Sequence, residues 1–249
     1  MTVVSNGQIL TVSSGQTSNG VIVLSGGELN ILSGGTISNT LNSGGADIIS
    51  SGGIAIGTTV NSRSEEVVFA GGTTIGTTVY GDGVDYVSSG GTASGTMLVN
   101  SSNPRNDFAA QVVFSGGQAI DTAVGDFCQQ FALAGTDINT VISSGGEEFV
   151  SSGTSISATI SNGGVQNVGT LGAAIGTTIS GGGVEEIEQG GIGTSAVIDS
   201  GGTLDVMGSN GCFFFLLPLE QRTSQLFLVV GSYKIWARRR PRRSALAAD

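Results

Sequence analysis

The chain repeats itself every 19 residues, and pairs of glycines mark the repeat. The pairs that keep this spacing fall into two series: Gly52-Gly53, Gly71-Gly72 and Gly90-Gly91, then Gly163-Gly164, Gly182-Gly183 and Gly201-Gly202. A fixed period of this length is typical of a solenoid, in which each coil buries its apolar side only against neighbouring coils. The period therefore constrains the fold more tightly than the length of 249 residues does.

Two positions of the repeat are apolar in unit after unit. The first column holds Ile49, Val68, Val87, Val150, Val168, Ile187 and Val206, and the second holds Val60, Val79, Leu98, Ile160, Ile179 and Ile198. Most of these side chains are β-branched, which favours strands, and glycine suits the corners between strands. We therefore predict an all-β fold, a right-handed parallel β-helix with about 19 residues per rung.

Composition excludes several other classes of protein. Glycine is abundant, with 43 residues, but it does not recur at every third position and there are only 3 prolines, which excludes collagen. A hydrophobic content of 39% excludes a disordered linker. The 2 cysteines cannot form a disulfide framework. No apolar run is long enough to cross a bilayer, so no transmembrane segment is expected.

Charge divides the chain into two parts. Residues 1–211 carry 2 basic and 17 acidic residues, a net charge of −15, whereas residues 212–249 carry 7 basic and 2 acidic residues, a net charge of +5. The acidic first part would repel phosphates, so we expect no nucleic-acid partner. We predict a β-helix repeat domain over 1–211 and a non-repeat tail over 212–249. The tail is either an apolar cap over the last rung or an out-of-frame, disordered end.

Two interruptions of the repeat stand out. Between Gly90-Gly91 and Gly116-Gly117 the spacing is 26 residues, and the polar stretch 101–107 predicts an insertion loop there. The stretch Gly125–Phe131 lacks the glycine pair. Loops on a regular rod are places where function concentrates, although a neutral insertion is the commoner explanation.

The sequence offers little catalytic chemistry. Histidine is absent, which removes serine–histidine and cysteine–histidine nucleophilic sites, and no glycine-rich phosphate-binding motif is present. The acidic pairs Glu65-Glu66, Glu147-Glu148 and Glu185-Glu186 recur at one rung position, which indicates a structural column. We therefore assign no catalytic, cofactor-binding or metal-binding residue, and we expect no cofactor and no enzymatic activity.

The acidic column still raises an electrostatic question. Asp47, Glu66 and Asp85 are 19 residues apart and would stack one per rung. Two charges about 5 Å apart in water repel by roughly 0.8 kcal/mol. We expect this column to face solvent and predict that salt or Ca²⁺ stabilises it. The stretch Gly81–Val87 is similar to part of a calcium-binding nonapeptide, but it lacks the tandem copies such sites need.

The repeat pattern itself resembles that of a known family. The pattern Asn-Ser-Gly-Gly-x-x-x-Val-Ser-Ser-Gly-Gly-x-Ala-x-Gly-Thr-Thr-Val is similar to the repeats of AIDA and antigen 43-type passenger domains of bacterial autotransporter adhesins, with Val87–Leu98 the nearest local match. The similarity covers about residues 20–208. It implies an exported stalk, at the cell surface or secreted, that acts in adhesion or self-association.

The resemblance also implies partners and leaves alternatives open. Its partners would be other copies of the chain, surface components of host or neighbouring cells, or carbohydrate. We see neither an export signal nor a translocator barrel in the sequence, both of which the family has. Two other functions stay open: a carbohydrate-active β-helix enzyme, and a repeat spacer preceding an autoprocessing Hedgehog/intein-like domain.

Overall fold

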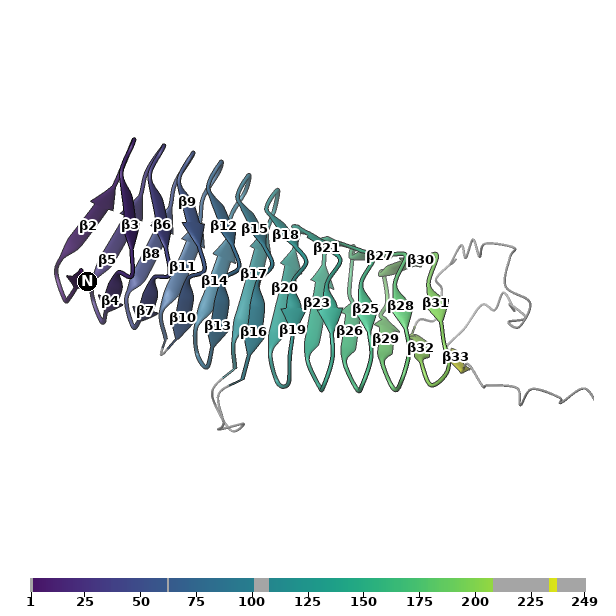
Figure 1. Cartoon of the computed structure of the whole chain (residues 1–249). Helices are drawn as coiled ribbons and strands as arrows, with labels where there is room; N and C mark the ends of the chain where they lie inside the picture. Colours follow the sequence, from purple (N-terminus) through teal and green to yellow (C-terminus); the bar gives the residue numbers. More distant parts are fainter. Residues whose placement is uncertain (1, 62, 101–107, 208–232, 237–249) are drawn as a thin grey trace, which may run out of the picture.

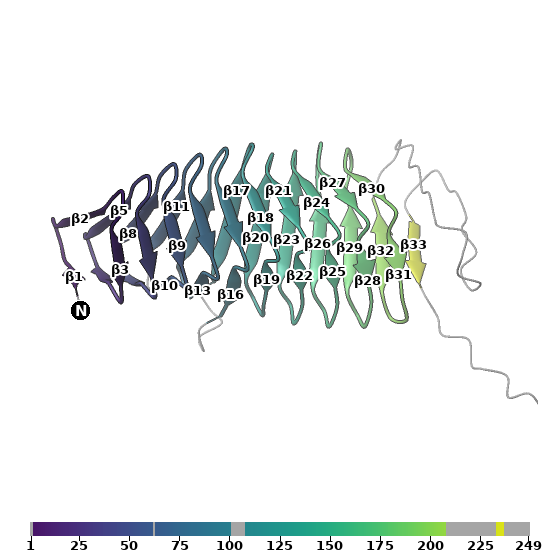
Figure 2. The same ribbon diagram turned by 45° about the horizontal axis from the view of Figure 1, so that its top comes forward.

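The computed structural model describes residues 2–61, 63–100, 108–207 and 233–236. The chain winds into a rod of stacked rungs, and Figures 1 and 2 show the rungs following one another from the N-terminal end to the C-terminal end. Each rung contributes one short strand to each of three sheets. The prediction of an all-β solenoid with rungs about 19 residues apart is confirmed.

The three sheets are called A, B and C, and the chain visits them in the order B, C, A within a rung. Sheet B contains β2 (Ile9–Val12), β5 (Glu28–Ile31), β8 (Ala46–Ile49), β11 (Glu65–Val68), β14 (Val84–Val87), β17 (Ala110–Phe114), β20 (Gln129–Leu133), β23 (Glu147–Ser151), β26 (Val165–Val168), β29 (Val184–Ile187), β32 (Thr203–Val206) and β33 (Tyr233–Trp236). Sheet C contains β3 (Thr17–Asn19), β6 (Thr36–Ser38), β9 (Ile54–Ile56), β12 (Thr73–Ile75), β15 (Thr92–Ser94), β18 (Gln118–Ile120), β21 (Thr136–Ile138), β24 (Thr154–Ile156), β27 (Ala173–Ile175) and β30 (Ile192–Thr194). Sheet A contains β1 (Val3–Val4), β4 (Ile22–Leu24), β7 (Leu41–Ser43), β10 (Thr59–Asn61), β13 (Thr78–Tyr80), β16 (Met97–Val99), β19 (Ala123–Val124), β22 (Val141–Ile142), β25 (Thr159–Ile160), β28 (Thr178–Ile179) and β31 (Val197–Ile198).

Both predicted apolar columns line the interior. The first column, on sheet B, is buried at every position, and the second, on sheet A, is buried at every position except the partly buried Ile198. Residues alternate between the two sides of each strand, so a column two residues away from the first also points inward. Burying each valine or isoleucine contributes about 1.5–3 kcal/mol, and this contribution repeats from rung to rung.

The glycine pairs of the first series lie at sheet B to sheet C corners and those of the second series at sheet A to sheet B corners, and the pair Gly71-Gly72 shows that the two glycines have separate causes. Gly71 adopts a φ of +76°, which an L side chain rarely tolerates. At Gly72 the φ is ordinary, but a Cβ there would lie 2.5 Å from the carbonyl oxygen of Ile49 on the preceding rung. The first glycine therefore makes the turn, and the second lets the backbones of successive rungs approach closely.

The predicted insertion lies outside the described residues, but its consequence for the sheet is clear. β17 resumes full register with β14, with Val84 opposite Ala110 and Val87 opposite Val113. The extra residues after β16 therefore leave the stacking of sheet B unchanged.

The predicted tail lies largely outside the described residues, and the proposed division at residue 211 stays a prediction. Its described strand, β33, pairs with β32 in antiparallel fashion, unlike the parallel pairs between the other strands described. Among the described residues no helix is long and apolar enough to span a membrane.

Candidate functional site

The acidic column points into the rod, so the prediction that it faces solvent is wrong. Asp47, Glu66 and Asp85 are fully buried, and they stack directly in the register of sheet B. The strands that carry them are continuous and alternate regularly, so each acid points to the same side as the inward residue two positions further along. These acids therefore share the interior with Ile49, Val68 and the rest of the first apolar column.

The acids belong to a longer column that crosses most of the rod. We call it the buried polar column, and its members are Asp47, Glu66, Asp85, Gln111, Gln130, Glu148, Gln166 and Glu185. Leu29 precedes it and Leu204 follows it in the same register. A second column, the threonine column, comes just before the strands of sheet A, and its buried members include Thr40, Thr58, Thr77, Thr96, Thr122, Thr140 and Thr177.

In the middle of the rod, glutamines connect the buried polar column. The Gln111 amide donates to Asp85 Oδ2 at 2.8 Å, and the Gln130 amide donates to Gln111 Oε1 at 3.0 Å. From the threonine column, Thr122 donates to Gln111 Oε1 at 2.9 Å and Thr140 donates to Gln130 Oε1 at 3.0 Å. Amide donors and hydroxyl donors thus satisfy each buried carbonyl oxygen here, as buried polar groups require.

A similar arrangement recurs near the C-terminal end. The Gln166 amide donates to Glu148 Oε2 at 2.6 Å and to Ser155 Oγ at 2.9 Å. Thr177 lies within hydrogen-bond distance of Gln166 Oε1, at 3.1 Å, and of Glu185 Oε1, at 3.3 Å. Gln166 lies on the rung between Glu148 and Glu185; it bonds to Glu148 directly and shares Thr177 with Glu185. Glu148 Oε1 and Glu185 Oε2 have no hydrogen-bond partner among the described residues.

The N-terminal part of the column has too few donors for its carboxyl oxygens. Within the described residues, neither carboxyl oxygen of Asp47 has a hydrogen-bond partner, and neither does Glu66 Oε1 or Asp85 Oδ1. Thr77 donates to Glu66 Oε2 at 2.7 Å, which satisfies one of the two Glu66 oxygens. A buried carboxylate oxygen without a donor is costly, because burial removes the water that would otherwise solvate the charge.

Burial consequently raises the pKa of the interior acids. It raises the pKa of Asp47 to about 8 and, against hydrogen bonds from Gln111 and Thr96, that of Asp85 to about 6. Burial, followed by the neighbouring charge of Asp85, raises the pKa of Glu66 well above its ordinary value. Asp47 therefore holds its proton near neutral pH, and that proton can act as a hydrogen-bond donor; the pKa of Glu66 is shifted in the same direction.

The C-terminal acids show the same effect. Burial raises the pKa of Glu185 to about 7 and also raises that of Glu148. Asp137, on the inner side of sheet C, has its pKa raised well above the ordinary value by burial first and by the charge of Glu148 second.

The recurring acidic pairs straddle the wall of the rod. Glu66, Glu148 and Glu185 point inward, while their sequence neighbours Glu65, Glu147 and Glu186 point outward. The two carboxyl groups of each pair lie on opposite sides of a sheet, so they cannot act together on one substrate. The inward carboxyls are sealed from solvent as well. Glu65-Glu66 and Glu147-Glu148 share one rung position, but Glu185-Glu186 is displaced by one residue, so the prediction that all three pairs recur at one position is wrong for the third.

The calcium-like stretch is divided in the same way. Asp85 of this stretch lies inside the rod, whereas Asp82 lies at an outer turn and accepts a hydrogen bond from Arg63 Nε at 3.3 Å. Across the described part of the chain, no three acidic, cysteine or histidine residues gather closely enough to hold a metal ion. With the acidic column buried, the expected stabilisation by Ca²⁺ loses its structural basis.

The outer faces of the three sheets differ in charge. Sheet B carries the outward acids Glu28, Glu65, Glu147 and Glu186, together with the stacked rings of Phe131 and Phe149, whose centroids lie 5.2 Å apart. The outward positions of the sheet A strands carry no charged residue.

Sheet C is also uncharged on its outer side. We call this side the sheet C face, and its two outward columns are Thr17, Thr36, Ile54, Thr73, Thr92, Gln118, Thr136, Thr154, Ala173 and Ile192, and Asn19, Ser38, Ile56, Ile75, Ser94, Ile120, Ile138, Ile156, Ile175 and Thr194. Threonine dominates the first column and isoleucine the second.

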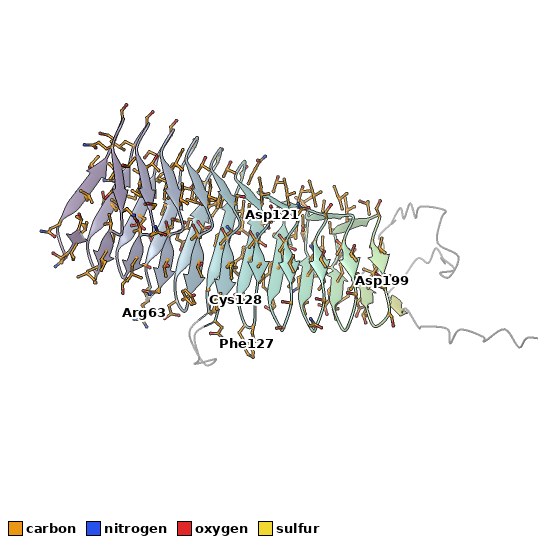
Figure 3. The ribbon with its side chains drawn as sticks, viewed as in Figure 1. Arg63, Asp121, Phe127, Cys128 and Asp199 are labelled. Atoms are coloured by element: carbon orange, nitrogen blue, oxygen red, sulfur yellow. The ribbon has the colours of Figure 1, made fainter. Side chains whose placement is uncertain are left out.

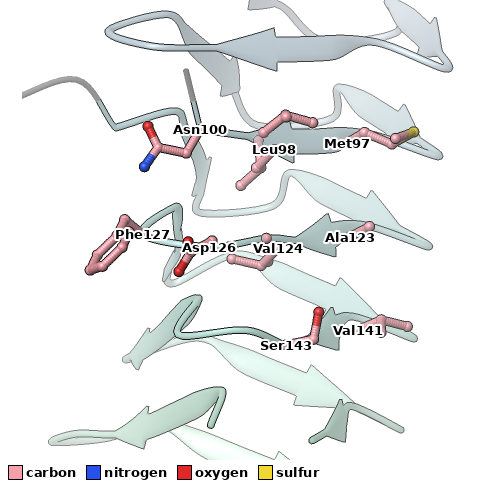
Figure 4. Close-up of a pocket in the computed structure, with 11 residues that line it drawn as sticks. Met97, Leu98, Asn100, Ala123, Val124, Asp126, Phe127, Val141 and Ser143 are labelled. Atoms are coloured by element: carbon pink, nitrogen blue, oxygen red, sulfur yellow. The ribbon is translucent and has the colours of Figure 1, made fainter. Parts of the chain in front are cut away.

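A shallow pocket of about 480 Å³ lies on sheet A beside the corner that leads to sheet B. Figure 4 shows Met97, Ala123 and Val141 on successive strands at one side of it and Phe127 at the other. Its described lining includes one carboxyl group, that of Asp126, and so does not offer the two carboxyl groups that glycoside hydrolysis uses.

The corner beside the pocket is the stretch that lacks a glycine pair. Figure 3 shows Phe127 projecting from the rod there while Cys128 lies inside, and Cys128 is completely buried. Burial raises the pKa of the Cys128 thiol to about 11, which makes it a poor nucleophile.

Comparison with known proteins gives a structural neighbour. Neither a protein-family model nor a curated protein matches the chain. A solved structure described as a TibC-catalysed, hyper-glycosylated fragment of TibA, residues 55–350, matches with a TM-score of 0.60 and 28% sequence identity. The match covers 84% of this chain and 96% of that fragment. The chain is thus similar in fold to the passenger fragment of an autotransporter adhesin.

Proposed function

We propose that the chain is a non-enzymatic, cell-surface or secreted stalk that acts in adhesion by associating with other copies of itself. The observation that carries this proposal is the form of the molecule: a rod of stacked rungs whose titratable interior is sealed and whose outer sides are long, regular ladders. The similarity to an adhesin passenger fragment supports it. An adhesive stalk needs length and surface, which a solenoid supplies.

The enzymatic alternative has less support. A carbohydrate-active β-helix would need carboxyl groups that converge on an open groove. Here the inward members of the acidic pairs are buried, and the pocket on sheet A carries one carboxyl group among its described lining residues.

The proposal is tested by joining the chain to a surface anchor on non-adherent bacteria and measuring their sedimentation. We expect cells that display the chain to aggregate and settle faster than cells with the anchor alone. Purified chain added in excess should inhibit the aggregation, since it competes for the same surface. The absence of both aggregation and concentration-dependent association of the purified chain would refute the adhesive role. Release of reducing sugars from polysaccharides would refute the non-enzymatic one.

A further inference from the structure

The sheet C face combines regularity with exposed apolar side chains. Every strand of sheet C has three residues, and all are in complete register. Ile56, Ile75 and Ile175 on this face are 42%, 45% and 41% exposed, which is high for isoleucine in a strand. Extended apolar patches on soluble proteins mark surfaces of interaction.

Apolar side chains also continue around one edge of this face. Leu32, Phe69 and Leu133 directly follow the last inward residue of their sheet B strands, at the corner that leads to sheet C, and all three are exposed. The apolar area is therefore wider than the strands of sheet C alone.

Electrostatics favours this face for contact between two copies. Residues 1–211 carry 2 basic and 17 acidic residues, so two such rods repel each other at long range. The outward acids of sheet B would meet in a contact through that sheet, whereas the sheet C face contributes no charged side chain. Contact through sheet C keeps the outward acids of sheet B apart and leaves Asp121 and Glu188 at the edges of the face.

Sheet A is uncharged as well, but its surface is less continuous. Its strands shorten to two residues from β19 (Ala123–Val124) onward, and the chain leaves it after β16 (Met97–Val99) for the inserted residues. Sheet C retains three-residue strands along its whole length. No inserted stretch as long as 101–107 lies next to its described strands. Of the two uncharged faces, sheet C thus offers the longer regular surface.

The size of the face suits weak pairing. Ten strands about 4.8 Å apart give a length of about 45 Å, and three residues give a width of about 10 Å. Two such faces would bury about 900 Å² in total, which lies at the low end for specific interfaces. Many rods displayed together would add their weak contacts, since linked sites reinforce one another.

We propose that the sheet C face packs against the same face of a second copy of this chain. This inference rests on the proposed self-association and identifies the surface that performs it. The isoleucine column supplies apolar contact, and the threonine column supplies hydroxyl groups that hydrogen-bond to the partner or to bridging water.

The test uses the full chain and two charged variants with changes at Ile56, Ile75, Ile138 and Ile156. One variant carries glutamate at all four positions and the other carries lysine. These positions lie on the third, fourth, seventh and eighth strands of sheet C, so each set meets itself whether the copies pack in parallel or antiparallel. We expect the unmodified chain to associate with rising concentration, and each variant alone to associate at least tenfold more weakly by sedimentation velocity. An equal mixture of the two variants should regain association, because opposite charges then face each other.

A matched control places glutamate on sheet A at Thr59, Thr78, Thr159 and Thr178, and we expect it to associate as the unmodified chain does. Circular dichroism and the melting temperature verify that each variant folds. If a fourfold variant does not fold, a variant changed only at Ile75 and Ile138 takes its place. If the sheet C variants associate as strongly as the unmodified chain, or if the sheet A variant no longer associates, this inference is wrong and the proposed function still stands. An unmodified chain that never associates overturns this inference, and it overturns the proposed function too if cells that display the chain also do not aggregate.

Discussion

Two segments of the buried polar column occupy the same strand position but differ in how they are satisfied. The acidic segment is Asp47, Glu66 and Asp85, and the glutamine segment is Gln111 and Gln130. Both are completely buried. The glutamine segment has a donor for each carbonyl oxygen, whereas the acidic segment leaves four carboxyl oxygens without a partner among the described residues: both of Asp47, Oε1 of Glu66 and Oδ1 of Asp85.

The difference shows what a stacked interior demands of a polar side chain. Glutamine carries both a donor and an acceptor, so identical residues on successive rungs can bond to one another. An ionised carboxyl group only accepts, so stacked carboxylates compete for donors and repel. A proton converts the carboxyl into a donor, which makes the acidic segment sensitive to pH and the glutamine segment insensitive.

The largest effect should come from converting the glutamine segment into an acidic one. Gln130→Glu removes the amide that donates to Gln111 and places a carboxyl group next to Glu148 in the register. We expect it to lower the free energy of unfolding by about 3–5 kcal/mol at pH 8, the cost of an uncompensated buried charge, and by less at pH 5. Urea unfolding at the two pH values measures this.

Gln118→Glu is the control for that change. Gln118 is exposed on the sheet C face, so the same chemical substitution should alter the free energy of unfolding by at most about 0.5 kcal/mol. Equal losses at positions 118 and 130 would contradict the argument, because they would show that burial is irrelevant.

The second prediction concerns the pH dependence of the unmodified chain. The acids of the buried polar column bind their protons more tightly in the fold than in the unfolded chain, where carboxyl pKa values lie near 4. Their stabilisation is therefore complete below about pH 4 and is lost as the pH rises through their folded pKa values. Those values are about 6 for Asp85, about 7 for Glu185 and about 8 for Asp47.

We accordingly expect the melting temperature and the free energy of unfolding to fall as the pH is raised from 5 to 8, the free energy by several kcal/mol in total. The variant Asp47→Asn, Glu66→Gln, Asp85→Asn should flatten this profile, because its amides do not titrate. A flat profile for the unmodified chain would show that the interior acids do not govern the pH dependence, and an equally steep one for the variant would show that Asp47, Glu66 and Asp85 do not contribute to it.

The third prediction converts a single acid into its amide. Glu66→Gln keeps the shape of the side chain and an oxygen that can accept from Thr77, and it adds donors next to Asp47 and Asp85. We expect the free energy of unfolding at pH 8 to rise by about 1–2 kcal/mol, the typical cost of an unsatisfied buried polar group. Glu65→Gln on the same strand faces outward and should have almost no effect. A loss of stability in Glu66→Gln would mean that the carboxyl has a partner that the amide cannot replace.

The sequence predicts the frame of this molecule better than its interior chemistry. The period, the two apolar columns and the glycine corners follow from spacing alone, and the structure confirms the solenoid. The direction of Asp47, Glu66 and Asp85 was predicted wrongly, because acidic residues are rarely buried and solvent exposure is their usual state. The alternation of the strand nevertheless places them inside.

A signal for the buried column was present in the sequence. Gln111, Gln130 and Gln166 continue the position of the acids, although the insertion near 101–107 shifts the first of them out of the 19-residue spacing. Threonines also recur 10 or 11 residues after members of the column, the separation of the hydrogen bonds that join the two columns. Their partnership requires the two sheets to face each other across the interior, which spacing along the chain does not specify.

The smallest effect should distinguish a threonine that bonds to the buried polar column from one that precedes the column. Thr122 donates to Gln111 in the glutamine segment, whereas Thr40, at the N-terminal end of the threonine column, has no partner for its Oγ1 among the described residues. Valine has nearly the same shape as threonine but no hydroxyl. We expect Thr122→Val to lower the free energy of unfolding by about 1 kcal/mol, the net value of one hydrogen bond. Thr40→Val should leave it unchanged or raise it slightly, because an unsatisfied hydroxyl is removed from the interior. Urea unfolding of the two variants at pH 8 measures both changes, and a larger loss at position 40 than at position 122 would contradict the argument that a partnered hydroxyl stabilises the interior.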